Sequence, residues 1–216
     1  MGVLADDRID EIIISDDASD LSIYDKVKDF VDGIPKVKLY RNAENQDCYK
    51  NKKTSITYAK NDYAILLDSD NKISSDYIDK IFNVVNWGGH VAMLPSFAMP
   101  HFNYGQYSGR TITKENVHRD MGNPTFTCML NTMNFFVNRE AYLKAWDETV
   151  NPNTADSIYM NYRLLNNGGR LYVVPDLTYE HRVDDHRNEQ AGHYNTNNHK
   201  TGSFYSETEQ KLKELR

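Results

Sequence analysis

The sequence predicts an α/β domain in which helices cover a mostly parallel central sheet, and three observations lead to this prediction. The first is a continuous apolar run, Tyr63-Ala64-Ile65-Leu66-Leu67, which is typical of a strand buried on both faces of a parallel sheet. The second is the alternation of strand-like and helix-like segments along the chain. The third is that apolar strand segments end in acidic residues, at the place where ligands bind in open α/β sheets.

The composition fits one globular domain and narrows the range of partners. The chain has 216 residues, of which 39% are apolar and 26% charged, which is enough to bury a sizeable core. A net charge of -6 without a long run of Lys or Arg argues against nucleic acid or an anionic membrane as the main partner. Two cysteines, Cys48 and Cys128, are too few for a disulfide scaffold, although they allow one bridge. No apolar stretch reaches the ~20 residues of a transmembrane helix and no signal peptide is visible, so a cytoplasmic location is the default expectation.

The first part of the chain predicts strands and helices in alternation. Apolar residues at i, i+4, i+7 and i+8 from Ile23 predict a helix with one buried face, which Gly33 and Pro35 end. The polar residues 41–53 predict a loop. The expected elements are, in order, a strand at residues 9–14, a helix through residues 23–31, a strand at residues 36–40, a helix around residues 54–60 and the strand at residues 63–67.

The second part of the chain continues this alternation around one long irregular region. Residues 96–127 show little periodicity, and a loop of this length in a compact domain is usually functional. Ser206 and Glu209 form a capping box that predicts the start of a C-terminal helix. The expected elements are, in order, a helix capped by Ser74 or Ser75, a strand at residues 90–94 ended by Pro95, a strand at residues 135–137, a helix at residues 139–148, a helix capped by Thr154 and running to Gly168, and a strand at residues 171–174 ended by Pro175.

Asp68 and Asp70 follow the central apolar run directly. Side chains two residues apart in an extended chain point the same way, so both carboxylates can address one site. Two oxygen ligands suit Mg²⁺ or Mn²⁺ and, through the ion, a diphosphate. The alternative interpretation is a solvated strand end, because Asp and Ser are common turn residues. The motif alone leaves both interpretations open.

Four segments, in this order, resemble the GT-A nucleotide-sugar glycosyltransferases of the family-2 type. The segments are Ile12-Ile13-Ile14-Ser15-Asp16-Asp17-Ala18-Ser19-Asp20, Ala64-Ile65-Leu66-Leu67-Asp68-Ser69-Asp70, Phe135-Phe136-Val137-Asn138-Arg139-Glu140, and the helix from Asp156 that leads to Gly168-Gly169-Arg170-Leu171. The match covers roughly residues 9–186. The resemblance implies a Rossmann-like three-layer sandwich and a single glycosyltransferase domain over residues 1–216, either alone or as one domain of a longer protein.

The resemblance also implies a function. It predicts a metal-dependent glycosyltransferase that uses Mn²⁺ or Mg²⁺ and moves a sugar from a nucleoside diphosphate sugar, with UDP as the favoured nucleotide, to an acceptor hydroxyl on a glycan or glycoprotein. Residues 96–127 are the expected acceptor-facing region. For Asp16 and Asp17 the alternative is capping of the next helix, and for Lys52 and Lys53 it is a solvated surface position. The residues implied in nucleotide-sugar binding are Asp16, Asp17, Lys52, Lys53, Asp68, Ser69 and Asp70.

The same resemblance points to a catalytic base and to metal ligands. Asp156 is the expected base that deprotonates the acceptor hydroxyl, although the family has two acidic residues here and this chain has Ser157 second. The alternative role of Asp156 is a favourable interaction with the helix dipole. Histidines in a polar tail are otherwise simply exposed. The expected metal ligands are Asp68, Asp70 and His181, with His186 as the second choice for the histidine.

Two features keep other functions open. The family opens with an additional strand, and here Val3-Leu4-Ala5 is either its remnant or the sign of its loss. The single acid at Asp156 leaves a non-catalytic carbohydrate- or nucleotide-binding remnant as the alternative function. A phosphatase with an Asp-x-Asp nucleophile ranks lower, because Lys72 stands where that class has Thr or Val. A sugar nucleotidyltransferase also ranks lower, because no Gly-rich phosphate loop is present near the N-terminus.

Overall fold

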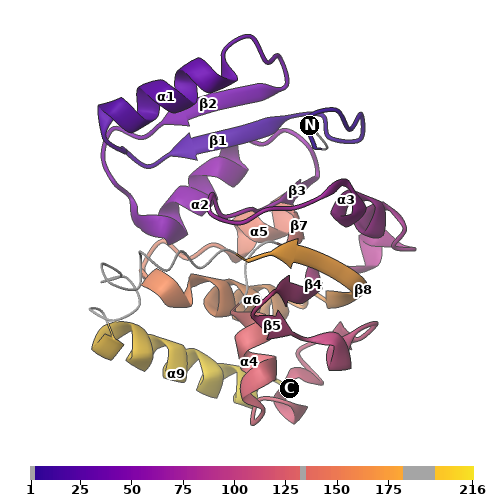
Figure 1. Cartoon of the computed structure of the whole chain (residues 1–216). Helices are drawn as coiled ribbons and strands as arrows, with labels where there is room; N and C mark the ends of the chain where they lie inside the picture. Colours follow the sequence, from indigo (N-terminus) through magenta and orange to yellow (C-terminus); the bar gives the residue numbers. More distant parts are fainter. Residues whose placement is uncertain (1–2, 132–134, 182–197) are drawn as a thin grey trace.

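The structure, a computed structural model, describes residues 3–131, 135–181 and 198–216 and consists of two sheets with helices around them (Figure 1). The strands are β1 (Ile12–Asp16), β2 (Val37–Arg41), β3 (Tyr63–Ile65), β4 (Ala92–Met99), β5 (Phe102–Asn103), β6 (Thr111–Ile112), β7 (Phe136–Asn138) and β8 (Leu171–Glu180). The described α-helices are α1 (Leu21–Val31), α2 (Asp47–Tyr58), α3 (Ser75–Phe82), α4 (Pro124–Leu130), α5 (Arg139–Ala145), α6 (Asp156–Asn166) and α9 (Asn198–Glu214). Short 3-10 turns are η1 (Trp87–Gly89), η2 (Gly105–Tyr107), η3 (Val117–Arg119) and η4 (Asn153–Ala155).

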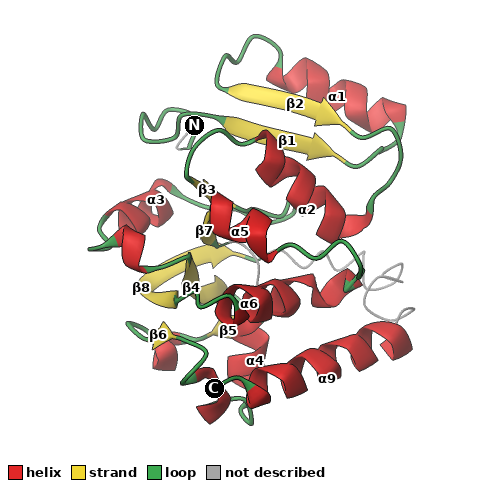
Figure 2. Cartoon of the chain, turned by 180° about the vertical axis from the view of Figure 1, so that it is seen from behind, coloured by secondary structure: helices red, strands yellow, loops and turns green. Residues whose placement is uncertain are grey.

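The molecule is layered from α1 at one end to α9 at the other. The parallel β1–β2 sheet lies between α1 and α2, as both views show (Figures 1 and 2). Helix α2 contacts β1 on one side and α5 on the other, so it connects this small sheet to the rest of the molecule. Helix α6 lies between the central sheet and α9 (Figure 2). The α/β class and its layers agree with the prediction.

The central sheet is mixed, which refines the predicted mostly parallel arrangement. Its strand order is β3-β7-β4-β8-β6, and β5 pairs with β4. Strands β4 and β8 are parallel, whereas β7 is antiparallel to both β3 and β4. Because β3 and β4 both oppose β7, they run in the same direction as each other and as β8. The carboxyl ends of β3, β4 and β8 therefore lie at one edge of the sheet.

The apolar run at residues 63–67 is less buried than predicted. Strand β3 is shorter than the run, its three residues are half-buried, and Leu67 is 42% exposed. Within the described residues β3 has a ladder partner on one side only, because β1 belongs to the separate two-stranded sheet. Val3-Leu4-Ala5 lies in turns, so it does not supply the missing strand. A strand without a second neighbour keeps part of its surface exposed.

Two prolines lie inside strands that they were predicted to end. Strand β4 continues through Pro95 to Met99, and β8 continues through Pro175 to Glu180. The β4–β8 pairing shifts its register between Pro95 and Phe97, and a bulge of this kind tolerates the missing N–H of proline. Both strands are therefore longer than predicted. Most residues of β4 are fully buried. Part of the region predicted to be an irregular loop, residues 96–127, is therefore strand and short helix.

Three helices begin at positions other than those predicted. Helix α2 begins at Asp47 inside the stretch predicted to be a loop, because Tyr49 and Ile56, two turns apart, are both buried. Helix α9 already runs through Ser206, so the predicted capping box lies inside the helix. Helix α6 has Ala155 as its N-cap instead of Thr154.

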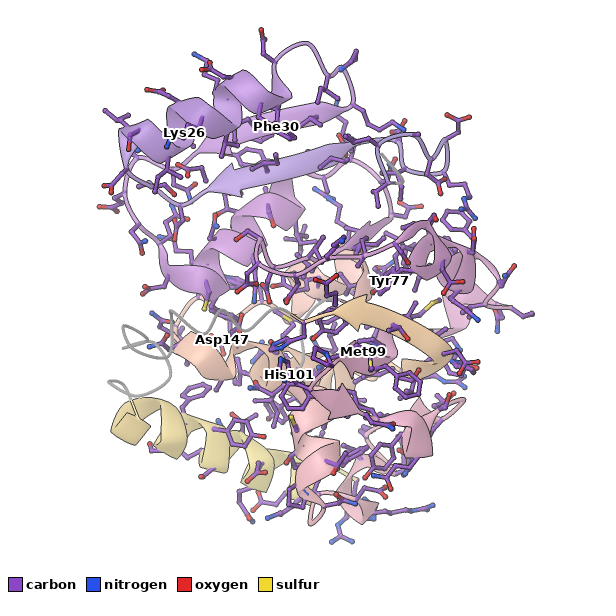
Figure 3. The ribbon with its side chains drawn as sticks, viewed as in Figure 1. Lys26, Phe30, Tyr77, Met99, His101 and Asp147 are labelled. Atoms are coloured by element: carbon purple, nitrogen blue, oxygen red, sulfur yellow. The ribbon has the colours of Figure 1, made fainter. Side chains whose placement is uncertain are left out.

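Helix α1 ends near Gly33 as predicted, but its apolar face is not buried. Ile23 is 52% exposed and Phe30, which Figure 3 labels on this helix, is 77% exposed. The helix covers a sheet of only two strands, which is too narrow to bury a full apolar stripe. Cys48 and Cys128 are both free thiols. Among the described residues no helix is both long and apolar enough to cross a membrane.

Candidate functional site

The first group of candidate residues lies at the carboxyl ends of β1 and β2. Asp16 Oδ2 accepts a hydrogen bond from the Arg41 guanidinium at 2.7 Å. Asp17 Oδ1 accepts from Asn42 Nδ2 at 2.8 Å and from a backbone N–H of the β2–α2 loop at 2.9 Å. Neither carboxylate is the N-cap of α1, which is Asp20. The two carboxylates instead tie the loop after β1 to the loop after β2.

Asn51, which no sequence pattern marks, joins α2 to this group. Its Nδ2 donates to the backbone oxygen of Ser15 at 3.0 Å, and its Oδ1 accepts from Ser15 Oγ at 2.7 Å. Asn42 Nδ2 also donates to Asn51 Oδ1, at 3.0 Å. The role of Asn51 depends on α2 beginning at Asp47, and the polar composition of that stretch gave no indication of a helix.

Lys52, the next residue of α2, connects two carboxylates that are far apart in the sequence. Its Nζ lies 3.1 Å from Asp68 Oδ1 and 3.0 Å from Asp156 Oδ2. Only 17% of the Lys52 side chain is exposed. Burial opposes the charge on Lys52, but the carboxylates of Asp156 and Asp68 outweigh burial and raise the pKa of Lys52 well above its ordinary value. The ammonium group therefore stays charged and holds Asp68 and Asp156 together.

Asp156 is the first residue of α6 and is almost fully buried. Lys52 Nζ donates to its Oδ2 at 3.0 Å, and Ser157 Oγ donates to its Oδ1 at 3.2 Å. A carboxylate in the first turn also interacts favourably with the positive end of the helix dipole. Asp156 therefore lies where it interacts favourably with the dipole of α6, as the alternative prediction stated. Through Lys52 it also lies near Asp68, at the acidic end of the segment that follows β3.

Backbone pairing brings the loop 68–70 to the carboxyl end of β8. Lys72 and Glu180 exchange two backbone hydrogen bonds, of 3.0 and 2.8 Å, so the segment after the loop is paired with the last residue of the strand. His181 follows directly, and its backbone N–H donates to the carbonyl oxygen of Met99, the last residue of β4, at 2.7 Å. The carboxyl ends of β4 and β8 therefore meet beside the loop 68–70.

The His181 side chain is influenced electrostatically by both carboxylates of this loop. Burial and the neighbouring His101 lower the pKa of His181, while the charges of Asp70 and Asp68 oppose them. His101, labelled in Figure 3, contacts His181 with ring centroids 5.7 Å apart. Nδ1 of His181 is buried and has no hydrogen-bond partner among the described residues. The lowered pKa favours the neutral imidazole, which is the form that binds metal ions.

These side chains suit a divalent ion in chemical type. Two carboxylates and one neutral imidazole are suitable ligands, and the unpartnered Nδ1 of His181 marks a polar atom with unused capacity. In the part of the chain that the structure describes, no three His, Cys, Asp or Glu side chains are already assembled into a metal site. A complete protein cage is not required, because Mg²⁺ is usually held by one or two carboxylates together with substrate phosphates and water.

Three residues of the predicted site are not shown to take part in this group around Lys52, Asp68 and Asp156. Ser69 is exposed in the turn between the two aspartates. Lys53 follows Lys52 in α2, but the ion pairs to Asp68 and Asp156 that the structure records belong to Lys52. His186 lies outside the described residues.

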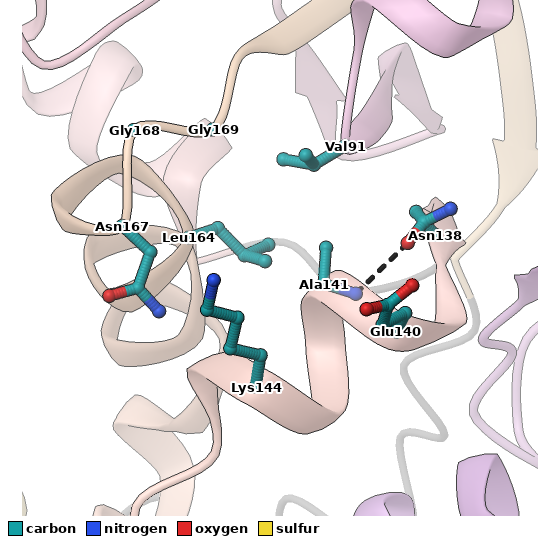
Figure 4. A pocket seen from close by; sticks show the side chains of 9 residues that line it. All are labelled: Val91, Asn138, Glu140, Ala141, Lys144, Leu164, Asn167, Gly168 and Gly169. Atoms are coloured by element: carbon teal, nitrogen blue, oxygen red, sulfur yellow. Dashed lines mark hydrogen bonds between the residues drawn. The ribbon is translucent and has the colours of Figure 1, made fainter.

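A surface pocket of 260 Å³ lies at the opposite end of the central sheet (Figure 4). It is lined by Val91, which precedes β4, by Gly168 and Gly169, which precede β8, and by Lys144 of α5. These residues lie at the amino ends of β4 and β8, whereas the loop 68–70 lies beside the carboxyl ends. The pocket is therefore separate from the candidate site.

Comparison with known families gives one match. The family model described as "Glycosyl transferase family 2" matches residues 3–146, which include the loop 68–70 and Lys52. Comparison with curated proteins gives no match.

Solved structures share the fold at low sequence identity. TarS of S. aureus in complex with UDP has a TM-score of 0.61 at 13% identity, over 81% of this chain and 51% of that chain. The mannosyltransferase PcManGT from Pyrobaculum calidifontis, in complex with GDP-Man and Mn²⁺, has a TM-score of 0.55 at 14% identity, over 95% of this chain and 60% of that chain. GalNAc-T7 with UDP, GalNAc and Mn²⁺ has a TM-score of 0.55 at 15% identity, over 80% of this chain and 38% of that chain. The likeness confirms the predicted GT-A fold, and this chain spans 31% to 51% of the length of the TarS structures that it matches.

Proposed function

The chain belongs to glycosyltransferase family 2, and we propose that it is a metal-dependent transferase that moves a sugar from a UDP-sugar to a hydroxyl of a glycan or glycoprotein. The observation that carries the proposal is the ion pairing of Lys52 with both Asp68 and Asp156. It holds an acidic strand end, suited to a metal-bound diphosphate, beside a buried carboxylate that suits a base. A metal-dependent transfer in which the acceptor oxygen displaces the diphosphate directly uses both of these parts.

The nucleotide of the donor lies across the carboxyl ends of β1 and β2 in this proposal. Asp16 and Asp17 already accept hydrogen bonds from the protein, but a carboxylate has about four acceptor sites. Both residues therefore retain capacity for ribose hydroxyls or for the uracil N–H. Structures of this fold with UDP, UDP-GlcNAc or GDP-Man support a nucleotide donor.

Asp70, Asp68 and His181 are the proposed ligands of the divalent ion, Mn²⁺ or Mg²⁺. When bound, such an ion supplies Lewis-acid stabilisation of the charge that develops on the leaving diphosphate. The two structures of this fold that contain Mn²⁺ support a metal-dependent donor site. The protein contributes the position of these ligands, which the pairing of Lys72 with Glu180 fixes.

Asp156 is the proposed base. It takes the proton from the acceptor hydroxyl while the acceptor oxygen forms a bond to the anomeric carbon of the sugar. The bond between that carbon and the diphosphate oxygen breaks, and its electron pair leaves with the diphosphate. Lys52 and Ser157 orient the carboxylate through hydrogen bonds of 3.0 and 3.2 Å.

Residues 96–127 supply the acceptor side in this proposal, and residues 1–216 act as a single glycosyltransferase domain. The region starts in β4, which ends next to His181. His101, just after β4, contacts the ring of His181 and so borders the proposed metal site. An acceptor bound along this region would approach the sugar from the side of the sheet edge where Asp156 lies.

Calorimetric titration of UDP with and without Mn²⁺ tests the donor site. The wild-type protein is expected to bind UDP more tightly with Mn²⁺, and Asp70→Ala is expected to lose the metal-dependent part of this affinity. Asp76→Ala is the matched control, because Asp76 is an exposed acidic residue in the first turn of α3. It removes one negative charge nearby and should leave the metal dependence unchanged.

Each other outcome has a defined meaning for the proposal. If neither UDP nor GDP binds in the presence of Mn²⁺, the donor site as described is wrong. If UDP binds with Mn²⁺ but no UDP-sugar is turned over with or without glycan acceptors, the non-catalytic binding alternative replaces the transferase.

A further inference from the structure

Lys52 forms ion pairs with two carboxylates, Asp68 of the proposed metal site and Asp156, the proposed base. Its Nζ is 3.1 Å from Asp68 Oδ1 and 3.0 Å from Asp156 Oδ2, so one ammonium group faces two carboxylates. The three groups together carry one net negative charge. Asp68 is the more exposed partner, with 37% of its side chain accessible, while the Asp156 side chain is 6% exposed. A cation that approaches Asp68 from solvent therefore meets Lys52 already bound there.

We propose that Lys52 competes with the metal ion for Asp68 and, once the ion is bound, acts as the positioning residue of Asp156. The inference rests on the proposed function and adds a coupling between the donor side and the acceptor side of the site. Lys52 is thus assigned a role other than binding the nucleotide, which is the role that the sequence suggested for it.

The competition follows from the charges at Asp68. Two cations on one carboxylate repel each other, and the repulsion is strong where little water screens it. A divalent ion bound by Asp68 and Asp70 therefore favours release of Asp68 from the ammonium group of Lys52. The released group does not become an unpaired buried charge, because Asp156 Oδ2 is already within hydrogen-bond distance at 3.0 Å.

The positioning role follows from the burial of Asp156. A buried carboxylate needs a charged or hydrogen-bonding partner, and Lys52 and Ser157 are the partners that the structure records for it. Loss of the Lys52 charge should therefore have two opposite effects. Metal binding at Asp68 becomes stronger, whereas Asp156 loses its counter-ion. A lysine that only bound the nucleotide would not strengthen metal binding when it is removed.

Binding of Mn²⁺ alone, followed by the EPR signal of the free ion, tests the competition. Lys52→Met is expected to bind Mn²⁺ roughly 2- to 5-fold more tightly than the wild type, which corresponds to the loss of one partly exposed ion pair. Lys52→Arg keeps the charge and should bind Mn²⁺ like the wild type. Lys50→Met is the matched control, since it makes the same change at an exposed lysine of α2. In the absence of nucleotide it should leave Mn²⁺ affinity unchanged.

Thermal unfolding of the same variants gives a second readout that also verifies folding. Mn²⁺ should raise the Tm of Lys52→Met more than that of the wild type at equal ion concentration, because tighter binding to the folded state stabilises it more. Unchanged or weaker Mn²⁺ binding by folded Lys52→Met overturns the competition, even if Asp70→Ala shows that the donor site is real. Absence of Mn²⁺ binding in the wild type, with and without UDP, instead overturns the proposed function and this inference together.

Discussion

Substitution of Gly169 by alanine is expected to destabilise the fold, because the position has no room for a methyl group. A Cβ atom there would lie 2.6 Å from Val91 Cγ2 and 2.7 Å from the backbone oxygen of Leu164. The N–H of Gly169 donates to that same oxygen at 2.9 Å, so the oxygen cannot move away without loosening the end of α6. Overpacking costs about 1–3 kcal/mol, and the rigid backbone contact favours the upper part of that range, about 2–3 kcal/mol.

Urea unfolding followed by the fluorescence of Trp87 and Trp146 measures this loss. Gly88→Ala is the matched control, because a Cβ atom at Gly88 meets no atom within 4 Å, and its free energy of unfolding should stay within about 0.5 kcal/mol of the wild type. In the double variant with Val91→Ala one of the two close contacts is removed, so a double-mutant cycle should show a favourable coupling of about 0.5–1 kcal/mol. The reasoning is refuted if Gly169→Ala is as stable as Gly88→Ala.

Two further predictions concern the base and the acid stability of the fold. Asp156→Asn keeps the shape of the side chain but not its basicity, so turnover of the UDP-sugar at saturating Mn²⁺ should fall about 10²–10⁴-fold. Unchanged turnover excludes Asp156 as the base. Hydrogen bonds from Thr149 and Tyr159 lower the pKa of Asp147 to about 2. Because this folded-state pKa lies below the unfolded value of about 3.9, the stabilisation by Asp147 is fully present near pH 5 and is lost as the pH falls towards 2. The difference in unfolding free energy between the wild type and Asp147→Asn should therefore shrink as the pH falls from 5 towards 2. A difference that stays constant would contradict the lowered pKa of Asp147.

The sequence predicted the acidic edge of the sheet because that pattern is local. An apolar run followed by Asp68 and Asp70 marks a strand end without any knowledge of the rest of the chain, and Asp156 at a helix start is equally local. The structure brings Asp68 and Asp156 to one site through Lys52, which agrees with the resemblance. Their roles in catalysis stay predictions.

Other features could not be read from the sequence, because they depend on the whole fold. The direction of β7 is one of them, since the apolar pattern of Phe136 and Val137 is the same in a parallel and an antiparallel strand. The path of β8 through Pro175 depends on its neighbours, which the sequence does not name. The partner of Lys52 is a third case, because a lysine in a polar stretch gives no sign of which carboxylates will face it.

The division into two sheets has a consequence for how firmly each half of the site is held. Every residue of β1 and β2 is half-buried, whereas most of β4 is fully buried, and among the described strands no ladder connects the two sheets. Local opening is easier where burial is lower, so backbone amides of β1 and β2 should exchange with deuterium well before those of β4. The half of the molecule proposed to bind the nucleotide should therefore open locally more often than the half that carries His181. Helix α2, which contacts both β1 and α5, connects the two halves.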